Sequence, residues 1–522
     1  MKKVLYQWQE ECLERWFANH GRGMVQAVTG SGKTLLALTA AERLEKQLNQ
    51  ELRVKIVVPT GALMRQWNQA LRNFLAESGG NKRQPADIQR EIGLRGAGYK
   101  ASSNRKYMIY VINSARYELA RQILSELRSG AAVLLIADEC HRYESDQNRL
   151  IFEFLPYIQP YETRFFSLGL SATLPHGQSQ SYLASVLGRK IYSYGMTKAA
   201  AMHTVCKYDI FHISLSFQHT ESDEYQEITD WMGTLYRRLL QMDPFLRDMN
   251  QKELFDMLTV LAGGQNRKLA ETASLYIKLS YKRRTLICLA SARIACACAL
   301  IERLQLSEKI IIFGERISQA EELYQLLQKQ YPEKVGRCHS KIGPLANKNT
   351  LNRFRDGEIR ILIACKSMDE GIDIPDAAVG IILSGTSVQR QRIQRLGRVI
   401  RKKEKKDRAS LYYLHLKDTI EDRCFLPNSG EDHLFELEYL SDTREFKNPL
   451  YDRAAAKLLA EMKSKGASAD KLSEARRCLR LGCIRSDWMS GYGNISNKIK
   501  SARHTEDKNY WICMKKIAEL LS

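Results

Sequence analysis

Short apolar runs alternate with helical patterns through the first two hundred residues of the chain. Each run is bounded by turn residues or polar segments. Such runs are typical of parallel strands that helices bury on both faces, so the pattern predicts a doubly wound α/β domain. The expected strands are Met24–Val28, Val54–Val58, Met108–Ile112, Val133–Ala137 and Phe165–Leu170.

The pattern changes to helical spacing between Ser222 and Leu304, as in Glu253–Ala262 and Ala270–Leu279. Strand-like runs then return and predict a second α/β unit of similar size. The chain after Leu450 has helical spacing and few β-branched runs. We therefore predict one domain over 1–205, a second over 206–425 that includes the helical segment 222–304, and a helical, basic region over 426–522. The strands expected in the second domain are Lys309–Phe313, Arg360–Ala364, Val379–Leu383 and Leu411–Leu414.

The charge of the chain is strongly positive, with 80 Lys and Arg against 59 Asp and Glu among 522 residues, a net charge of +21. An excess of this size favours a polyanionic partner, because neutralising phosphates releases counterions. An inert basic surface is the alternative. In the tail, Arg476, Lys498, Tyr510 and Trp511 belong to a basic and aromatic pattern that either binds nucleic acid or packs a core.

The 12 cysteines are scattered without zinc-ligand spacing, which favours a reducing, cytoplasmic location. The longest apolar stretch, Thr285–Ile301, is interrupted by Arg293 and is too short to span a bilayer. We expect a buried helix there and no membrane partner.

A candidate phosphate site follows the first expected strand and opens a helix. It reads Ala27-Val28-Thr29-Gly30-Ser31-Gly32-Lys33-Thr34. Backbone N–H groups of such a loop, together with the helix N-terminus, form a nest for phosphate oxygens. We expect residues 29–32 to cradle the phosphates of ATP, Lys33 to reach the β- and γ-phosphates, and Thr34 to bind Mg²⁺.

A pair of acids follows the expected strand Val133–Ala137, in the sequence Asp138-Glu139-Cys140-His141. Ligands of open α/β folds bind at the carboxyl ends of the strands, beside the phosphate loop. We therefore expect Asp138 to hold Mg²⁺ and Glu139 to orient and deprotonate the attacking water.

Together these two motifs resemble those of superfamily 2 helicases, although Ala27 replaces the usual first glycine and Cys140 the commoner alanine. Further motifs follow in order. Leu5-Tyr6-Gln7-Trp8-Gln9 resembles the Q-type motif, which implies that Gln9 reads adenine while Trp8 packs nearby. Val57-Val58-Pro59-Thr60 and Gln66-Trp67 resemble motif Ia, which implies nucleic-acid contacts by Pro59, Thr60 and Gln66. Leu170-Ser171-Ala172-Thr173 resembles motif III, which implies that Ser171 and Thr173, with His141, couple the ATP state to nucleic-acid grip.

The second half of the chain carries the remaining motifs of the resemblance. Met368-Asp369-Glu370-Gly371-Ile372-Asp373 resembles motif V, which implies nucleotide contacts by Gly371 and Asp373. Gln394-Arg395-Leu396-Gly397-Arg398-Val399-Ile400-Arg401 matches motif VI. Charge that accumulates on the transferring phosphoryl group needs guanidinium partners, so Arg398 and Arg401 are the expected arginine fingers. The resemblance gives Gln394 a coupling role and Arg395 a nucleic-acid role.

The resemblance implies two RecA-like domains with a helical insertion and a helical C-terminal extension. Motif order and spacing are most similar to duplex-DNA translocases and helicases of repair, recombination and restriction systems. We therefore expect an ATP- and Mg²⁺-dependent motor on nucleic acid, with DNA favoured over RNA and with a nuclease or defence-complex subunit as a further candidate partner. Two alternatives remain, an ATP-gated clamp that recruits a partner nuclease and an RNA helicase.

Overall fold

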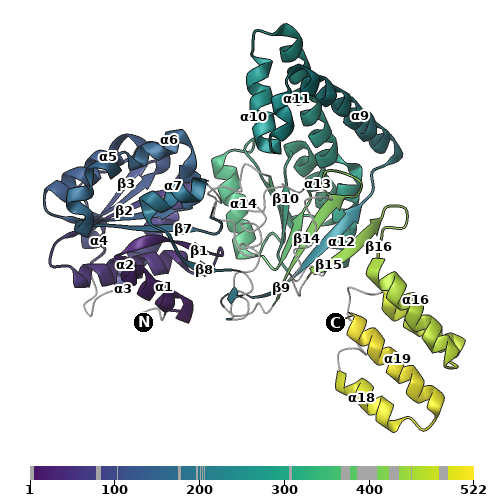
Figure 1. The fold of residues 1–522 in the computed structure, drawn as a ribbon. Coiled ribbons are helices and arrows are strands. Elements are labelled where there is room, and N and C mark those ends of the chain that lie inside the picture. The colour runs from purple at the N-terminus through teal and green to yellow at the C-terminus, as the bar shows by residue number, and fades with distance from the viewer. Residues whose placement is uncertain are drawn as a thin grey trace.

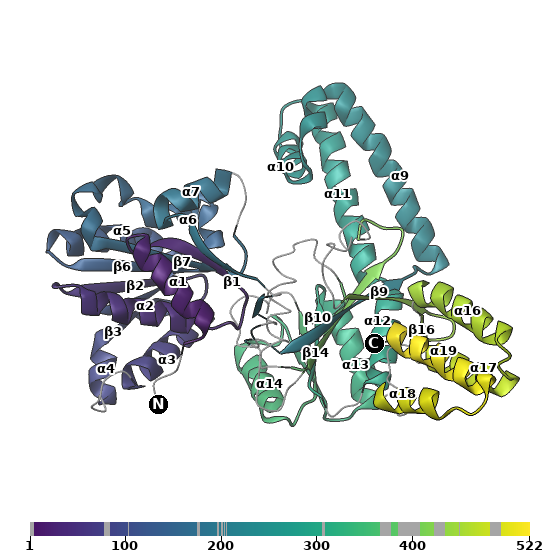
Figure 2. The same cartoon turned by 60° about the horizontal axis from the view of Figure 1, so that its bottom comes forward.

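The computed structural model describes residues 5–77, 84–102, 104–174, 178–195, 198–199, 202, 204, 206–304, 308–365, 377–384, 408–421, 434–447, 449–480 and 492–521. These residues form two α/β units, a helical arm and a helical tail (Figure 1). Figure 2 shows the two units side by side, with the arm standing away from the second unit.

The first unit is built on a sheet of strand order β4-β3-β5-β2-β6-β7-β1-β8. All neighbours pair in parallel except β3 and β4. Helices cover both faces, as the apolar runs predict. The strands are β1 Arg22–Ala27, β2 Leu52–Val58, β3 Ile92–Gly96, β4 Tyr99–Lys100, β5 Tyr107–Val111, β6 Ala132–Asp138, β7 Phe165–Ser171 and β8 Lys190–Tyr194. The helices are α1 Gln7–Ala18, α2 Lys33–Gln47, α3 Gly61–Glu77, α4 Pro85–Glu91, α5 Ile112–Arg128, α6 Asp146–Arg149 and α7 Gln178–Leu187.

The second unit has strand order β11-β12-β10-β13-β14-β9-β15-β16, parallel except for the edge pair β15 and β16. Its strands are β9 Lys207–Leu215, β10 Ile310–Gly314, β11 Val335–Cys338, β12 Ile361–Cys365, β13 Val379–Ile382, β14 Arg408–Leu416, β15 Leu434–Leu440 and β16 Glu445–Lys447. Its helices are α12 Ser291–Arg303, α13 Ile317–Gln330 and α14 Pro344–Asp356. All nine strands expected from apolar runs are present in the two sheets, which confirms the predicted fold class.

Two parts of the second sheet differ from the expectation. Strand β9 lies inside the sheet, between β14 and β15. Its sequence includes the polar residues Lys207, Asp209 and His212, so it has no continuous apolar run and was not among the expected strands. Strands β15 and β16 fall in the region 426–522 that we expected to be helical. They extend the sheet beyond β9, so the helical tail begins only at Pro449.

The arm is inserted between β9 and α12 and consists of α9 His219–Met242, α10 Gln251–Ala262 and α11 Arg267–Leu289. Its buried clusters include Ile228, Met232 and Leu279 near the base and Leu239 and Leu258 further out. The stretch Arg267–Arg303 has the length and apolarity of a membrane span, but 61% of its apolar window is buried inside the protein. Residues such as Ile294 and Ala297 belong to the core of the second unit, as expected for a buried helix.

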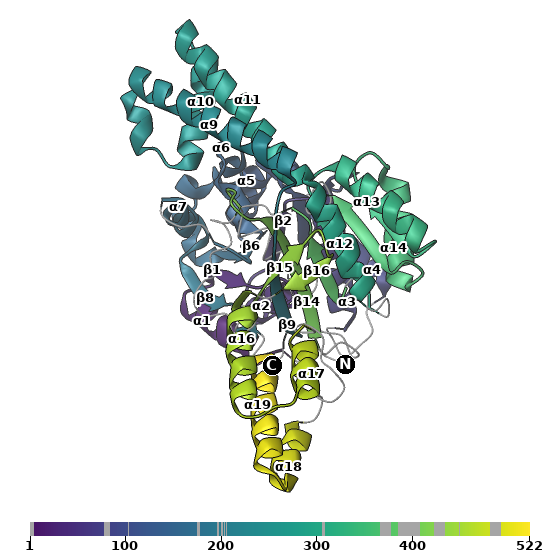
Figure 3. The same cartoon turned by 90° about the vertical axis from the view of Figure 1, so that its right-hand side faces the viewer.

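The tail consists of α16 Pro449–Ser464, α17 Ala469–Arg480, α18 Tyr492–Ser501 and α19 Thr505–Leu521. Figure 3 shows it at the opposite end of the second unit from the arm. It has a small core of its own, with Met462, Cys513 and Ile517 fully buried. Tyr510 belongs to this core and Trp511 packs against it, so these two rings stabilise the tail and do not present a stacking surface for bases.

Candidate nucleotide site and interdomain cleft

The loop between β1 and α2 has the shape expected of a phosphate nest. Gly30 and Gly32 have φ values of 87° and 96°, in the left-handed region that favours glycine. The Ser31 hydroxyl donates to the Val28 carbonyl over 2.7 Å, and the Ser31 N–H points to the same oxygen at 3.3 Å. These internal bonds hold the loop in place ahead of the N-terminus of α2, where unpaired N–H groups favour an anion.

Lys33 and Thr34 occupy the first turn of α2. The Lys33 ammonium donates to the carbonyl oxygens of Ala27 and Val28, at 2.9 and 3.5 Å, so its charge stays over the loop. The same charge acts on Asp138, where it opposes the rise in pKa that burial causes. The expected phosphate ligand and the expected metal ligand therefore share one site.

Gln9 joins the N-terminal helix to the phosphate loop. Its side-chain oxygen accepts the Tyr6 N–H over 2.9 Å, and its amide donates to the Gly32 carbonyl over 3.0 Å. A Cβ on Gly32 would lie only 2.8 Å from the Gln9 amide nitrogen, so the contact requires glycine. Gln9 is fully buried, and its predicted contact with adenine stays a prediction.

Trp8 packs in the core next to Gln9, and its expected role at the nucleotide stays a prediction. Its side chain is fully buried and stacks on Tyr194, with ring centroids 4.5 Å apart and ring planes 11° apart. Trp8 therefore supports α1 from the core side. Tyr194 is also part of the loop support, because its carbonyl accepts the Val28 N–H over 3.1 Å.

Asp138 ends β6 as a nearly buried carboxylate, 7% exposed. One carboxylate oxygen accepts the Glu139 N–H over 3.0 Å, and the other accepts the indole N–H of Trp67 over 2.7 Å. Burial raises the pKa of Asp138, while the Trp67 hydrogen bond and the Lys33 charge oppose that rise. Each carboxylate oxygen keeps a further lone pair. With the Thr34 hydroxyl in the first turn of α2, the expected donors are all oxygen, the set that suits Mg²⁺.

Glu139 adopts a left-handed backbone conformation, with φ of 48°, which is unusual for a residue other than glycine. Such strain persists where the surroundings over-determine it, and it is common at functional sites. The carboxylate lies 3.4 Å from Nδ1 of His141. The same ring nitrogen lies 2.8 Å from the Ser171 hydroxyl, which donates to the Thr173 carbonyl over 2.5 Å. The structure thus brings Glu139 and three of the four expected coupling residues into one chain of contacts.

The segment expected to be motif Ia leads from β2 into α3. The Thr60 side-chain oxygen accepts the Leu63 N–H over 3.3 Å and the Thr60 carbonyl accepts the Met64 N–H over 3.0 Å, so Thr60 starts the helix. Pro59 precedes it and is partly exposed. Gln66 lies on the face of α3 that lines the interdomain cavity. Nucleic-acid contacts at these three residues stay a prediction.

A cavity of about 1420 Å³ lies between the two units. It exceeds the roughly 300–1,000 Å³ of a typical small-molecule site, so it offers more room than one nucleotide needs. On one side the cavity is lined by the phosphate loop, α2 and α3. On the other side it is lined by residues of α14 and of the segment just before that helix. The lining includes Thr34, Arg43, Arg65, Gln66, Asn347, Lys348 and Arg355.

The expected site residues of the second unit lie outside the described residues. Gly371 and Asp373 fall in 366–376, and Gln394, Arg395, Arg398 and Arg401 fall in 385–407. Their roles stay predictions. Strands β12 and β13, which precede these segments in the sequence, flank β10 in parallel, so the carboxyl ends of the two strands lie at the same edge of the sheet.

Three buried residues of the site had no role in the expectation from sequence. Trp67 binds Asp138, as described above. The Tyr143 hydroxyl lies 2.6 Å from the Asp138 carbonyl and 2.9 Å from the Val57 carbonyl, which ties the ends of β6 and β2 together. Arg293 donates to the carbonyl oxygens of Leu383 and Leu414, at the ends of β13 and β14. Only Trp67 carried a signal, its place beside Gln66 in the motif Ia pattern.

Family models agree with this architecture. Residues 2–176 match the model described as type III restriction enzyme, res subunit, and residues 292–403 match the helicase conserved C-terminal domain. The chain is a superfamily 2 helicase. As a member of this class it is an ATP-hydrolysing enzyme, and both predictions are confirmed.

Named relatives place this helicase near the XPB proteins. It is 25% identical over 409 residues to the DNA 3'-5' translocase XPB2 of Sulfurisphaera tokodaii, which covers 77% of the helicase and 80% of the relative. It is 24% identical over 427 residues to the general transcription and DNA repair factor IIH helicase/translocase subunit XPB of Antonospora locustae, covering 79% of the helicase and 51% of that relative. The helicase thus spans about half the length of this longer relative.

Solved structures show the same fold at low identity. The Hef helicase domain of Pyrococcus furiosus matches with a TM-score of 0.52 and 17% identity, over 80% of this helicase and 96% of that chain. The type ISP restriction-modification enzyme LlaBIII bound to DNA matches with a TM-score of 0.50 and 14% identity, over 99% of this helicase and 33% of that chain. These likenesses establish the fold of the two units.

Proposed function

We propose that this helicase is a DNA translocase that hydrolyses Mg²⁺-bound ATP in the cleft between its two α/β units. The observation that carries the proposal is the convergence of the phosphate loop, Asp138 and Glu139 at one sheet edge that faces the second unit. The relatives whose names include DNA translocase or DNA repair helicase support DNA as the substrate. The net charge of +21 supports a polyanionic track.

The residues of the first unit have separate tasks in this mechanism. The loop N–H groups and Lys33 would hold the phosphates, while Thr34 and Asp138 would hold the metal, which would supply positive charge next to the phosphate oxygens. Glu139 orients the attacking water and accepts its proton. Its contact with His141 would pass a change in position on to Ser171, the last residue of β7, and to Thr173 just after that strand. Arg398 and Arg401 complete the site across the cleft.

We further propose that the protein is cytoplasmic and that it has a protein partner. Seven of the described cysteines are free thiols, and most of them are buried, which supports a reducing cytoplasm; they are Cys12, Cys140, Cys288, Cys296, Cys298, Cys338 and Cys513. A nuclease or a subunit of a defence complex is the proposed partner, because the res-subunit match describes a protein type that works with other subunits in restriction.

The deciding experiment measures ATP hydrolysis by the full chain with single-stranded DNA, duplex DNA, forked DNA and RNA at several salt concentrations. We expect duplex DNA to stimulate the rate most, and the stimulation to fall steeply with salt, because phosphate contacts release counterions. Equal rates with and without nucleic acid would contradict the motor. One ATP per binding event would favour the ATP-gated clamp, and stimulation by RNA alone would favour an RNA helicase.

A further inference from the structure

A buried hydrogen bond connects the helix of motif Ia to the expected metal ligand. The indole N–H of Trp67 donates to the Oδ2 oxygen of the Asp138 carboxylate over 2.7 Å. Trp67 is 2% exposed and Asp138 is 7% exposed. A hydrogen bond between a neutral donor and a carboxylate is stronger than a neutral pair, and burial strengthens it further. The contact is therefore a substantial constraint on the carboxylate.

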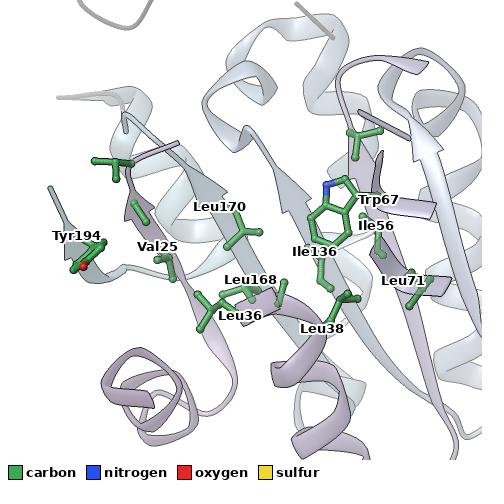
Figure 4. Close-up of a cluster of buried hydrophobic side chains, with 14 of the residues drawn as sticks. Val25, Leu36, Leu38, Ile56, Trp67, Leu71, Ile136, Leu168, Leu170 and Tyr194 are labelled. Carbon is green, nitrogen blue, oxygen red and sulfur yellow. The ribbon is translucent and has the colours of Figure 1, made fainter. Parts of the chain in front are cut away.

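The position of the indole is fixed by the way α3 packs. Met64, Trp67, Leu71 and Leu75 lie on one face of the helix at helical spacing, and all four are buried. The opposite face carries Gln66 and lines the cleft. Figure 4 shows the ring of Trp67 between Ile56 and Ile136 in the core, with its nitrogen on the side away from Leu71. The ring therefore has no freedom to turn its N–H elsewhere.

The two donors on Asp138 divide its oxygens between them. The Glu139 N–H takes one oxygen and the Trp67 indole takes the other, so the plane of the carboxylate is set from both ends. Tyr143 adds a third restraint at the backbone, since its hydroxyl lies 2.6 Å from the Asp138 carbonyl. Without the indole, one oxygen would lose its only described donor, and the side chain would be free to rotate about its χ2 bond.

We propose that Trp67 is a positioning residue that holds the Asp138 carboxylate in the orientation that binds Mg²⁺. This inference rests on the proposed Mg²⁺–ATP site and gives Trp67 a role that the resemblance to motif Ia does not imply. Residues that orient a metal ligand through a hydrogen bond typically change metal affinity by about 10–100-fold when they are replaced. The loss should appear in metal binding itself and not only in turnover.

The test compares Trp67→Phe with Trp16→Phe in the full chain. Trp16 is 1% exposed, and its indole N–H also makes one buried hydrogen bond, 3.0 Å long, to the Ser167 carbonyl of the same unit. Both variants keep an aromatic ring and lose one buried indole bond, but only Trp67 touches Asp138. Binding of Mn²⁺, a spectroscopic substitute for Mg²⁺, is titrated by electron paramagnetic resonance in the presence of ADP. ADP binding with chelator present is measured alongside.

We expect Trp67→Phe to weaken Mn²⁺ binding by about 10-fold or more, with ADP binding in chelator unchanged. Trp16→Phe should bind Mn²⁺ like the wild type. Equal Mn²⁺ affinity in wild type and Trp67→Phe would overturn the inference, and so would an equal loss in both variants, which indicates general loosening of the unit. A wild-type chain that binds ADP but no Mn²⁺ would instead refute the metal site of the proposed function.

A second measurement applies if Trp67→Phe does not fold. The chain has six tryptophans, so ¹⁵N labelling gives six indole signals. The signal that shifts most in Asp138→Asn, a change of one atom beside the indole, belongs to Trp67. Addition of Mg²⁺ and ADP to the wild type should shift that same signal, because the metal draws on the carboxylate that the indole holds. An unchanged Trp67 signal at saturating metal and ADP overturns the inference.

Discussion

Replacing Arg293 with methionine removes the centre of a buried polar cluster in the second unit. Arg293 is fully buried and donates to Glu421 over 2.5 Å, to Ile287 over 2.8 Å and to Leu414 over 3.0 Å, with a further bond to Leu383. The substitution leaves a buried carboxylate and three carbonyl oxygens without these donors. Breaking a buried pair from one side costs about 3–5 kcal/mol. For a unit of this size each kcal/mol lowers Tm by about 2–4 °C, so we expect a loss of about 6–20 °C.

The assay is thermal and urea unfolding of the full chain, with Arg353→Met as the control. Arg353 makes an ion pair of 2.9 Å with Glu358, but both side chains are more than half exposed, so its loss should cost less than about 1 kcal/mol. Adding Glu421→Leu to Arg293→Met should recover part of the stability, because it removes the unpaired charge. Similar losses in Arg293→Met and Arg353→Met would refute the reasoning.

Four further predictions concern catalysis, the tail and its pH dependence. Glu139→Gln should keep ATP binding and stop hydrolysis, and Arg398→Ala should cut the maximal rate by about 10³-fold with nucleotide affinity little changed. Steady-state rates and nucleotide titrations check both, and a normal rate in either variant removes that residue from its role. Deletion of 449–521 should leave a soluble chain, since this tail has its own core, with basal ATPase activity intact and DNA binding weaker. Aggregation of the shortened chain would show that the tail instead covers apolar surface of the second unit. The Lys465 and Lys516 ammonium groups lower the pKa of Glu461 from 4.5 to about 2, so its contribution to stability is present above pH 4.5 and is lost as pH falls towards 2. The Tm difference between wild type and Glu461→Gln should vanish over that range, and a difference independent of pH would contradict the assignment.

The sequence predicts the strands whose residues are apolar on both faces, because burial of a parallel strand leaves a continuous apolar run. It does not predict β9, whose pattern is mixed and whose place in the sheet depends on pairing with β14 and β15, far away in the chain. The phosphate loop and the Asp138–Glu139 pair are local patterns and are predicted. The bond from Trp67 to Asp138 joins residues 71 positions apart, and no local spacing encodes it.

For the side chains of the tail, the sequence likewise does not predict which ones lie in a core and which lie on the surface. Aromatic residues between basic residues are equally compatible with a stacking surface and with a small core, since helical spacing alone does not say which face another helix covers. Packing of α19 against α16 and α17 decides the matter for Tyr510. The stacking partner of Trp8 could not be predicted either, because Tyr194 comes from a distant strand.

Both ends of the arm are rooted in the second unit, at β9 and at α12. The two attachments restrict how far the arm can move on its own, so a rotation of the second unit carries the arm with it. With 24 residues in α9, its length is about 36 Å at 1.5 Å per residue. Each rotation of roughly 10° between the units would then sweep the tip through about 6 Å, close to the rise of two base pairs at about 3.4 Å each. A small closure of the cleft would therefore move the tip of the arm by about the length of a step along a duplex.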